Sequence, residues 1–327
     1  MRILILGGSG FIGRNLVEQL SKTIHIITSL DSVEEKLHKN VNYIQADIRD
    51  IDTNDLVAQT DLVIDLIAYA NPSLYVSDPL STFHICFTEN LKIVELCVRH
   101  KKKLIQFSTC EVYGDHGESS EPWNEQQTRF ITGPTHEIRW VYSNAKQTLE
   151  RLIYAYGTLH SLEYTIIRPF NFIGHDIDFL PSEQPGCPRV FSHFLDAIIN
   201  CGTIRLVNGG SQKRAYTYID DAIECIVKII DNPTSSKNKI FNIGTPDNET
   251  SIGDLARLMI DTAIQNKWIS KAPEIISATG EQFYGKGYAD ITRRIPCIDS
   301  VCNAVNWKPT TTLNDTILFS MRPWFGE

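Results

Sequence analysis

The stretch ILILGGSGFIG, residues 3–13, decides the fold. Its first four residues form an uninterrupted apolar run, which is typical of a parallel strand covered on both faces. Three glycines follow with the spacing G-x-x-G-x-x-G, at Gly7, Gly10 and Gly13. The first allows a tight turn, the second lets the backbone approach a pyrophosphate, and the third packs a helix on the strand. The stretch therefore predicts a strand, a phosphate-binding turn and a helix.

Apolar runs alternate with helical patterns along the first half of the chain, which predicts a doubly wound parallel sheet. After Pro169 the pattern changes to an irregular loop at 174–189 and then to short segments. We expect an α/β fold with a Rossmann domain over 1–170, to which 213–243 return, and a smaller C-terminal α/β substrate lobe over 171–327. Strands are predicted at 3–6, 24–27, 41–44, 62–67, 104–107, 164–167 and 240–244, and helices at 11–20, 89–98 and 140–156.

The composition is that of an ordinary globular protein, with 42% hydrophobic and 21% charged residues among 327. Lysine and arginine total 31 and acidic residues 39, a net charge of −8. This balance argues against binding driven by charge to nucleic acid or to a membrane surface. The sequence contains no run of 18 apolar residues, so we predict no membrane span. Eight cysteines without a C-x-x-C spacing indicate free thiols, no metal site and a cytoplasmic location.

An acidic residue follows the glycine stretch at the distance that a dinucleotide site needs. Asp31 lies 21 residues after Gly10, at the end of the second predicted strand. A carboxylate there can accept both ribose hydroxyls and would repel a 2′-phosphate, which favours NAD over NADP. Asp47 follows the third predicted strand and has two readings, an adenine contact or a loop residue that caps a turn.

A tyrosine and a lysine share one face of the predicted helix 140–156. Tyr142 and Lys146 are four residues apart, and therefore adjacent on the helix surface. A nearby ammonium stabilises a phenolate, so the pair can act as a general base toward a sugar hydroxyl. The alternative is a surface tyrosine beside a solvated lysine.

Three reactive side chains follow the strand at 104–107. Thr109, Cys110 and Glu111 are consecutive, and the carboxyl ends of parallel strands are where open sheets bind ligands. Cys110 is the unusual member, either a potential thiolate or a small buried residue.

These motifs resemble the extended short-chain dehydrogenase/reductase family that works on nucleotide sugars. The closest resemblance is to its UDP-glucuronate decarboxylase group, including the UDP-apiose/UDP-xylose synthases and the decarboxylase domains of bifunctional aminoarabinose–lipid A enzymes. It covers nearly the whole chain. Besides the glycine stretch and Tyr142-x-x-x-Lys146, it rests on STCEVYG (108–114), RPFNFIG (168–174), GGSQKR (209–214), FNIG (241–244) and YGKGY (284–288).

The resemblance implies oxidative decarboxylation of UDP-glucuronic acid with NAD as cofactor. Tyr142, assisted by Lys146, would remove the proton of the C4 hydroxyl while the C4 hydride passes to NAD, and Thr109 would hydrogen-bond the same oxygen. The resulting β-keto acid would lose CO₂. Glu111 and Arg294 would act around C5 and its carboxylate, which a guanidinium can bind with two hydrogen bonds. The alternative interpretation is that Arg294 is an ordinary surface arginine.

The resemblance also implies the binding residues and a homodimer, paired through helices near 89–99 and 140–156. Further NAD contacts are expected at Phe11, Ile12, Ile48, Ala68 and Pro169. Substrate contacts are expected at Tyr75, Arg139, Asn171, Arg189, Arg205, Gln212, Arg214, Tyr284 and Tyr288.

The product and two other functions stay open at this point. UDP-xylose, UDP-apiose and a released 4-ketopentose nucleotide are all compatible with this chemistry. The apiose synthases carry a second active-site cysteine where this chain has Ala70, which puts ring contraction in question. A UDP-sugar 4-epimerase or 4,6-dehydratase is the alternative enzyme, and a non-catalytic dinucleotide sensor is a remote one.

Overall fold

The computed structural model describes residues 1–33, 38–175, 177, 179–183, 188–286 and 288–326. The sequence motifs and segments above include Pro185, Gly186, Cys187 and Gly287, which lie outside the described residues.

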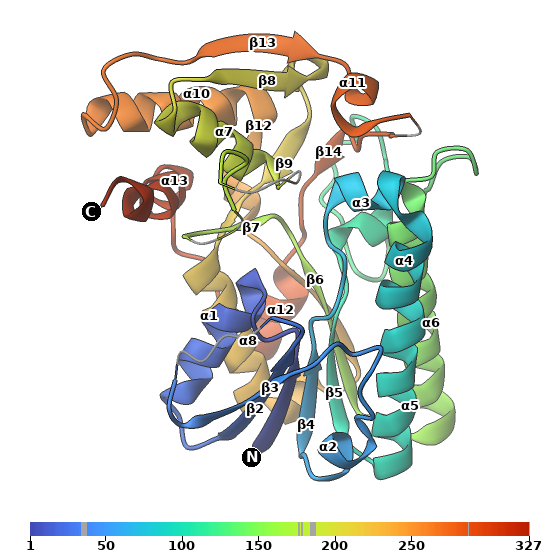
Figure 1. Cartoon of the computed structure of the whole chain (residues 1–327). Coiled ribbons are helices and arrows are strands. Elements are labelled where there is room, and N and C mark those ends of the chain that lie inside the picture. Colours follow the sequence, from blue (N-terminus) through green and yellow to red (C-terminus); the bar gives the residue numbers. More distant parts are fainter. Residues whose placement is uncertain (34–37, 176, 178, 184–187, 287, 327) are drawn as a thin grey trace.

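A seven-stranded parallel sheet forms the larger part of the molecule (Figure 1). Its spatial order is β3-β2-β1-β4-β5-β6-β11, so the order reverses between β1 and β4. That reversal opens a crevice at the carboxyl ends of the strands, as in other doubly wound sheets. This confirms the predicted Rossmann sheet. The strands are β1 (Arg2–Leu6), β2 (Ile26–Asp31), β3 (Val41–Gln45), β4 (Leu62–Asp65), β5 (Lys103–Phe107), β6 (Tyr164–Pro169) and β11 (Lys239–Ile243).

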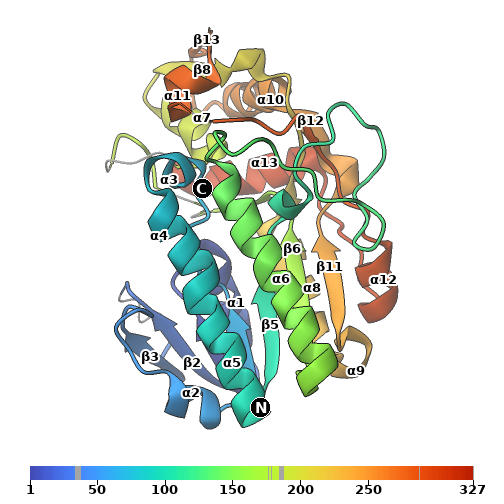
Figure 2. The same cartoon turned by 90° about the vertical axis from the view of Figure 1, so that its right-hand side faces the viewer.

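Helices cover both faces of this sheet, which explains the apolar runs. In β1, Ile3 and Ile5 belong to the core on the side of α1 (Phe11–Ser21) and α8 (Ile219–Asp231). Leu4 and Leu6 point to the opposite core. That second core packs under α2 (Asn54–Ala58), α5 (Asn90–His100) and α6 (Trp140–His160), of which α5 and α6 run side by side (Figure 2).

The second lobe lies beyond the carboxyl ends of the sheet strands (Figure 1). It contains three small sheets: β8 with β13, β9 with β12 and β14, and β7 with β10. Their strands are β7 (Phe172–Ile173), β8 (Thr203–Val207), β9 (Lys213–Ala215), β10 (Thr217–Tyr218), β12 (Glu249–Ser251), β13 (Glu274–Ala278) and β14 (Arg293–Arg294). The remaining helices of the C-terminal half are α7 (Val190–Ile199), α9 (Pro233–Ser236), α10 (Ile252–Gln265), α11 (Gly280–Tyr284), α12 (Asp299–Val305) and α13 (Leu313–Met321).

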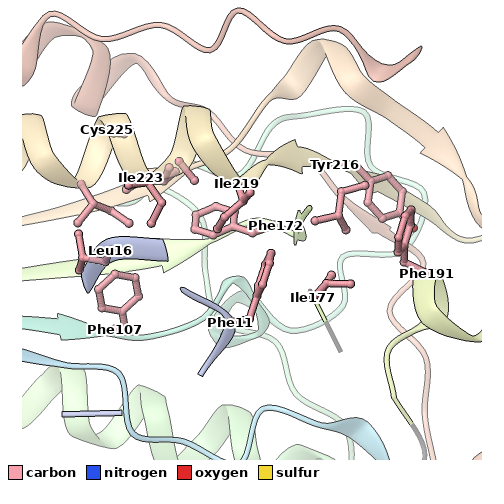
Figure 3. Packing of buried hydrophobic residues seen from close by; sticks show 14 of the residues in the cluster. Phe11, Leu16, Phe107, Phe172, Ile177, Phe191, Tyr216, Ile219, Ile223 and Cys225 are labelled. Carbon is pink, nitrogen blue, oxygen red and sulfur yellow. The ribbon is translucent and has the colours of Figure 1, made fainter. Parts of the chain in front are cut away.

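One apolar cluster joins the sheet to the second lobe. Figure 3 shows Phe11 of α1 near its middle, with Phe107 of the sheet to one side and Tyr216 and Phe191 to the other. Because β11 and α8 come late in the chain yet pack on the main sheet, the lobes are not consecutive in sequence. The division at residue 170 stays a prediction.

Several predicted boundaries are wrong. The strand predicted over 24–27 begins at Ile26 and runs to Asp31, because it must match β1 residue by residue, from Arg2 with Ile26 to Leu6 with Leu30. Ile24 is 95% exposed and lies before the sheet. The strand predicted over 62–67 stops at Asp65, and the helix predicted over 140–156 continues to His160.

The helical region before α5 is also longer than predicted. Three segments precede α5 there: α3 (Pro72–Ser77), α4 (Pro79–Phe83) and a π-helical turn, His84–Glu89. No helix in the described part of the chain is long and apolar enough to cross a membrane.

Candidate active site

The glycine stretch forms the turn between β1 and α1. Gly7 has a φ of +82°, which L side chains rarely adopt. A Cβ at Gly13 would lie 2.2 Å from the Gly7 carbonyl oxygen, so only glycine fits there. A Cβ at Gly10 would meet only that same oxygen, at 3.5 Å. Gly10 also begins α1 without a side-chain cap, which leaves the amide end of the helix for an anion.

Asp31 anchors this turn from the end of β2. Its carboxylate accepts hydrogen bonds from the backbone N–H of Ser9 at 3.0 Å and of Val33 at 3.1 Å. The turn and the ends of β1, β2 and β4 border a cavity, here called the glycine-loop cavity. Six predicted cofactor residues line it: Gly7, Gly10, Asp31, Asp47, Ile48 and Ala68. The glycine turn, the N-terminal end of α1 and the fixed Asp31 carboxylate together fit a dinucleotide.

Asp47 caps a turn and also lines this cavity. Its carboxylate accepts the backbone N–H of Arg49 at 2.9 Å and pairs with that residue's guanidinium at 2.9 and 2.6 Å. These hydrogen bonds lower the pKa of Asp47 to about 2. Arg49 itself lines the cavity, a cation that the sequence did not predict.

Tyr142 and Lys146 are both buried on α6. The Lys146 ammonium donates to Asn90 Oδ1 and to the Phe107 carbonyl, each at 3.0 Å. Burial raises the pKa of Tyr142 well above its usual value, while a hydrogen bond with the Thr109 side chain lowers it. Thr109 Oγ1 also accepts the Glu111 N–H at 3.1 Å. The phenol is therefore protonated in the ligand-free protein.

A buried cluster of one carboxylate and two guanidiniums lies next to this tyrosine. Glu111 pairs with Arg139 at 2.7 Å and with Arg294 at 3.1 Å. Burial raises the pKa of Glu111, but the charges of the two arginines outweigh it and the pKa is lowered. Arg139 Nε and Nη1 and Arg294 Nε are buried without a hydrogen-bond partner. Such donors call for a hydrogen-bond acceptor in the adjoining space.

Cys110 is buried beside this cluster. Burial raises the pKa of its thiol, although Arg294 acts in the opposite direction. The neutral thiol is therefore its resting form. All cysteines within the described ranges are free thiols, and no group of His, Cys, Asp or Glu there could hold a metal.

A second cavity between the sheet and the second lobe gathers the predicted substrate residues. We call it the substrate cavity. Five arginines and two carboxylates, Glu111 and Asp290, are among its described walls, a cationic excess in an acidic protein. Its walls include all nine predicted substrate residues, together with Ala70, Glu111 and Arg294: Tyr75, Arg139, Asn171, Arg189, Arg205, Gln212, Arg214, Tyr284 and Tyr288.

Some predicted residues lie outside the described walls of both cavities. Phe11, Ile12 and Gly13 form the first turn of α1, and Pro169 ends β6. Neither cavity has among its described lining residues the four predicted catalytic residues Thr109, Cys110, Tyr142 and Lys146. Tyr75 of the substrate cavity connects to them by stacking on Tyr142.

The sequence analysis missed several residues of the site. Asn90 accepts a hydrogen bond from Lys146 and another from Gln106, and the signal of these two residues was an amide within each of two apolar segments. Asp290 pairs with Arg214 at 2.9 Å, two residues after the YGKGY motif. The aromatic walls Phe172, Phe191 and Tyr216 carry no signal distinct from ordinary core residues.

Comparisons with known proteins agree with this geometry. Residues 3–244 match the model of the NAD dependent epimerase/dehydratase family. The chain is 35% identical over 350 residues to UDP-D-apiose/UDP-D-xylose synthase of Oryza sativa subsp. japonica, covering 97% of this chain and 87% of the relative.

Solved structures give the same result. The PbgP3 protein from Burkholderia pseudomallei is 32% identical, with a TM-score of 0.87 over 100% of this chain and 96% of its own. UDP-glucuronic acid 4-epimerase from Bacillus cereus, solved with UDP-glucuronic acid and NAD, shares the fold at 21% identity, with a TM-score of 0.83 over 98% of both chains. The predicted family resemblance is confirmed. The chain belongs to the NAD dependent epimerase/dehydratase family, a family of enzymes whose cofactor is NAD.

Proposed function

We propose that this enzyme oxidatively decarboxylates UDP-glucuronic acid through a UDP-4-keto intermediate. The observation that carries the proposal is the buried Glu111–Arg139–Arg294 cluster, whose three residues line the substrate cavity. The two guanidiniums outnumber the single carboxylate, which leaves one buried positive charge without a counter-charge in the cluster. The carboxylate of a sugar acid would balance that charge, whereas a neutral sugar would not.

The residues of the glycine-loop cavity would hold NAD. The N-terminal end of α1 and the turn at Gly7 and Gly10 suit its pyrophosphate, and Asp31 suits a ribose diol. When bound, NAD supplies the oxidant that removes the C4 hydrogen as hydride.

Tyr142 is the base in this scheme. Its phenolate takes the proton from the C4 hydroxyl, and Thr109 donates a hydrogen bond to the same oxygen. Lys146 is fixed by Asn90 and the Phe107 carbonyl, one helical turn along α6 from Tyr142, and its positive charge would favour the phenolate. Proton transfer by such a positioned base contributes roughly 10²–10⁴-fold to the rate.

Arg139 and Arg294 would bind the C5 carboxylate. With a ketone at C4, the carboxylate belongs to a β-keto acid, and its C–C bond breaks to give CO₂ and an enolate. The enolate is then protonated at C5. Glu111 keeps both guanidiniums in place and is itself a carboxylate at rest, because its pKa is lowered.

The other three arginines of the substrate cavity would bind the diphosphate. Arg189, Arg205 and Arg214 approach from α7, β8 and β9 of the second lobe. UDP-glucuronic acid carries negative charge on both the diphosphate and the carboxylate, and the cationic excess of the walls complements it.

Three final products are compatible with this chemistry. Reduction of the C4 ketone gives UDP-xylose, and release before reduction gives the 4-ketopentose nucleotide. UDP-apiose requires a retro-aldol opening and closure of a smaller ring, for which Cys110 would have to lose its proton. The neutral Cys110 thiol and Ala70 in the cavity wall favour the first two products.

A UDP-sugar 4-epimerase is the second candidate. The relatives with that activity share this fold. A 4-epimerase acting on UDP-glucuronic acid must leave the carboxylate intact, so the fate of the carboxylate distinguishes the two functions. We further propose a homodimer through α5 and α6, where Tyr154 and Leu159 are exposed. The cytoplasmic location stays a prediction.

NMR of the reaction mixture tests the proposal. The purified protein is incubated with UDP-glucuronic acid and NAD, and the sugar signals are followed. A pentose nucleotide is expected. Accumulation of UDP-galacturonic acid would show an epimerase instead.

A further inference from the structure

A buried carboxylic acid lies behind the catalytic lysine, and the mechanism above does not use it. Asp65 is the last residue of β4 and is 0% exposed. Its Oδ1 accepts the backbone N–H of Ile67 at 3.0 Å. Its Oδ2 is buried without a partner. Asp65 is paired in the sheet with Gln106 of β5, so the two residues are direct neighbours.

Hydrogen bonds connect Asp65 to Lys146 through two routes. In the first, Asn90 Nδ2 donates to the Ile67 carbonyl at 3.2 Å, and Asn90 Oδ1 accepts from Lys146 at 3.0 Å. In the second, Gln106 Nε2 donates to the Asp65 carbonyl at 3.3 Å and to Asn90 Oδ1 at 3.2 Å. Asn90 directly follows the π-helical turn, a distortion often found at functional sites.

The unpaired atoms of this network are both acceptors. Gln106 Oε1 is buried without a partner, as is Asp65 Oδ2. The orientation of the Gln106 amide is fixed, because its Nε2 donates to three oxygens. One proton on Asp65 would convert one of these acceptors into a donor. A neutral acid also avoids the large cost of a buried charge.

We propose that Asp65 is a positioning residue that gains and loses a proton as the pH changes and whose ionisation tunes Tyr142 through Lys146. This role of Tyr142 rests on the proposed function. An ionised Asp65 offsets the positive charge of Lys146, which raises the pKa of the phenol. A neutral Asp65 leaves the full charge of Lys146 acting on Tyr142, which favours the phenolate.

The groups around Asp65 leave Lys146 as the charge that acts on it. Lys146 faces it from α6, the neutral Gln106 from β5, the Cys97 thiol from α5 and the Cys86 thiol from the π-helical turn. Burial raises the pKa of both thiols, which are therefore neutral. Burial also raises the pKa of Asp65 to about 6, with Lys146 opposing. Tyr142 is in turn faced by Cys86, Glu111, Cys110 and Tyr75, none of which is a cation.

Infrared spectroscopy of the ligand-free protein tests the protonation directly. With ¹³C-labelled aspartate, a protonated carboxyl band should be present at pH 5, lost by pH 8, and absent from Asp65→Asn. The side-chain amide introduced by this substitution would keep the acceptor for Ile67 and donate where the acid proton was. Asp221→Asn, a buried carboxylate bonded to Thr310 and Thr311, is the control and should keep the band. If wild-type protein shows no titrating band, the inference is wrong, whether or not the variant folds.

The pH dependence of turnover tests the coupling. In Asp65→Asn the acidic limb of kcat/KM should move to lower pH by roughly half a unit, because no negative charge then offsets Lys146. A purely structural Asp65 would leave the limb in place and overturn the coupling. The infrared result does not depend on the substrate, so a protein that fails to convert UDP-glucuronic acid would refute the proposed function while leaving the protonation of Asp65 intact.

Discussion

Tyr75 stacks on Tyr142, with ring centroids 4.4 Å apart and planes inclined by 11°. Tyr75 comes from α3 and lines the substrate cavity, whereas Tyr142 lies on α6 behind it. The contact covers one face of the phenol and fixes its orientation. It also links the wall of the substrate cavity to the Thr109–Tyr142–Lys146 group, which would otherwise be separate.

Replacing Tyr142 by phenylalanine should abolish turnover, with a loss of roughly 10²–10⁴-fold, because the ring still stacks but the base is gone. NAD binding, measured by calorimetry, should persist. Tyr156→Phe on the same helix removes only a hydrogen bond to Glu95 and should retain wild-type turnover. A Tyr142→Phe enzyme with substantial activity would remove this residue from its role.

Replacing Arg294 by alanine should suppress CO₂ release by roughly 10²–10³-fold, because one of the two guanidiniums at the carboxylate is lost. Glu111 would then keep only Arg139 as its partner in the cluster. The measurement is the rate of CO₂ release from labelled substrate. Arg257→Ala, at an exposed ion pair with Asp254, is the control. Unchanged release from the Arg294 variant would reject the assignment.

Two glycines of the phosphate-binding turn should respond differently to alanine. In Gly10→Ala the added methyl group has room in the ligand-free protein. The free energy of unfolding measured with denaturant should therefore be unchanged, while NAD binding weakens. Gly13→Ala brings a Cβ to 2.2 Å from the Gly7 oxygen and should lower the free energy of unfolding by about 2 kcal/mol as well. Gly202→Ala, with a nearest atom at 3.6 Å, is the control and should change neither quantity. Equal destabilisation by both turn variants would contradict the assigned roles.

The raised pKa of Asp65 should make stability depend on pH. A carboxyl whose pKa is higher in the folded protein than in the unfolded chain stabilises the folded state. This stabilisation is complete at pH values below the pKa of the unfolded chain, and it is lost as the pH rises through the folded pKa of about 6. The free energy of unfolding of Asp65→Asn relative to wild type should therefore increase by about 2 kcal/mol between pH 4 and pH 7. Urea titrations at several pH values measure it. A difference that stays constant with pH would show that folding does not shift the pKa of Asp65.

The fold and the local motifs were predictable because their signals are short-range. The apolar run at 3–6, the three glycines and the Tyr142–Lys146 spacing each follow from neighbouring residues, and the structure places them as a strand, a turn and one helix face. The start of β2 was not predictable, because it depends on pairing with β1 rather than on local apolarity.

The contacts that give the site its chemistry depend on residues far apart in the chain. Glu111 meets Arg139 from 28 positions away and Arg294 from the other lobe, and no local pattern encodes either pair. The environment of Asp65 likewise forms only when β4, β5, α5 and α6 assemble. Sequence reasoning named Glu111 from its place after a predicted strand and the arginines through the family resemblance, and it missed Asp65, Asn90 and Gln106.

The most direct test of the central claim is the fate of the substrate carboxylate. UDP-glucuronic acid labelled with ¹³C at C6 is incubated with the purified enzyme and NAD, and dissolved CO₂ and bicarbonate are followed by ¹³C NMR. Stoichiometric appearance of label in CO₂ and bicarbonate is the predicted result. Retention of all label in a nucleotide sugar, while C4 is oxidised or inverted, would contradict decarboxylation.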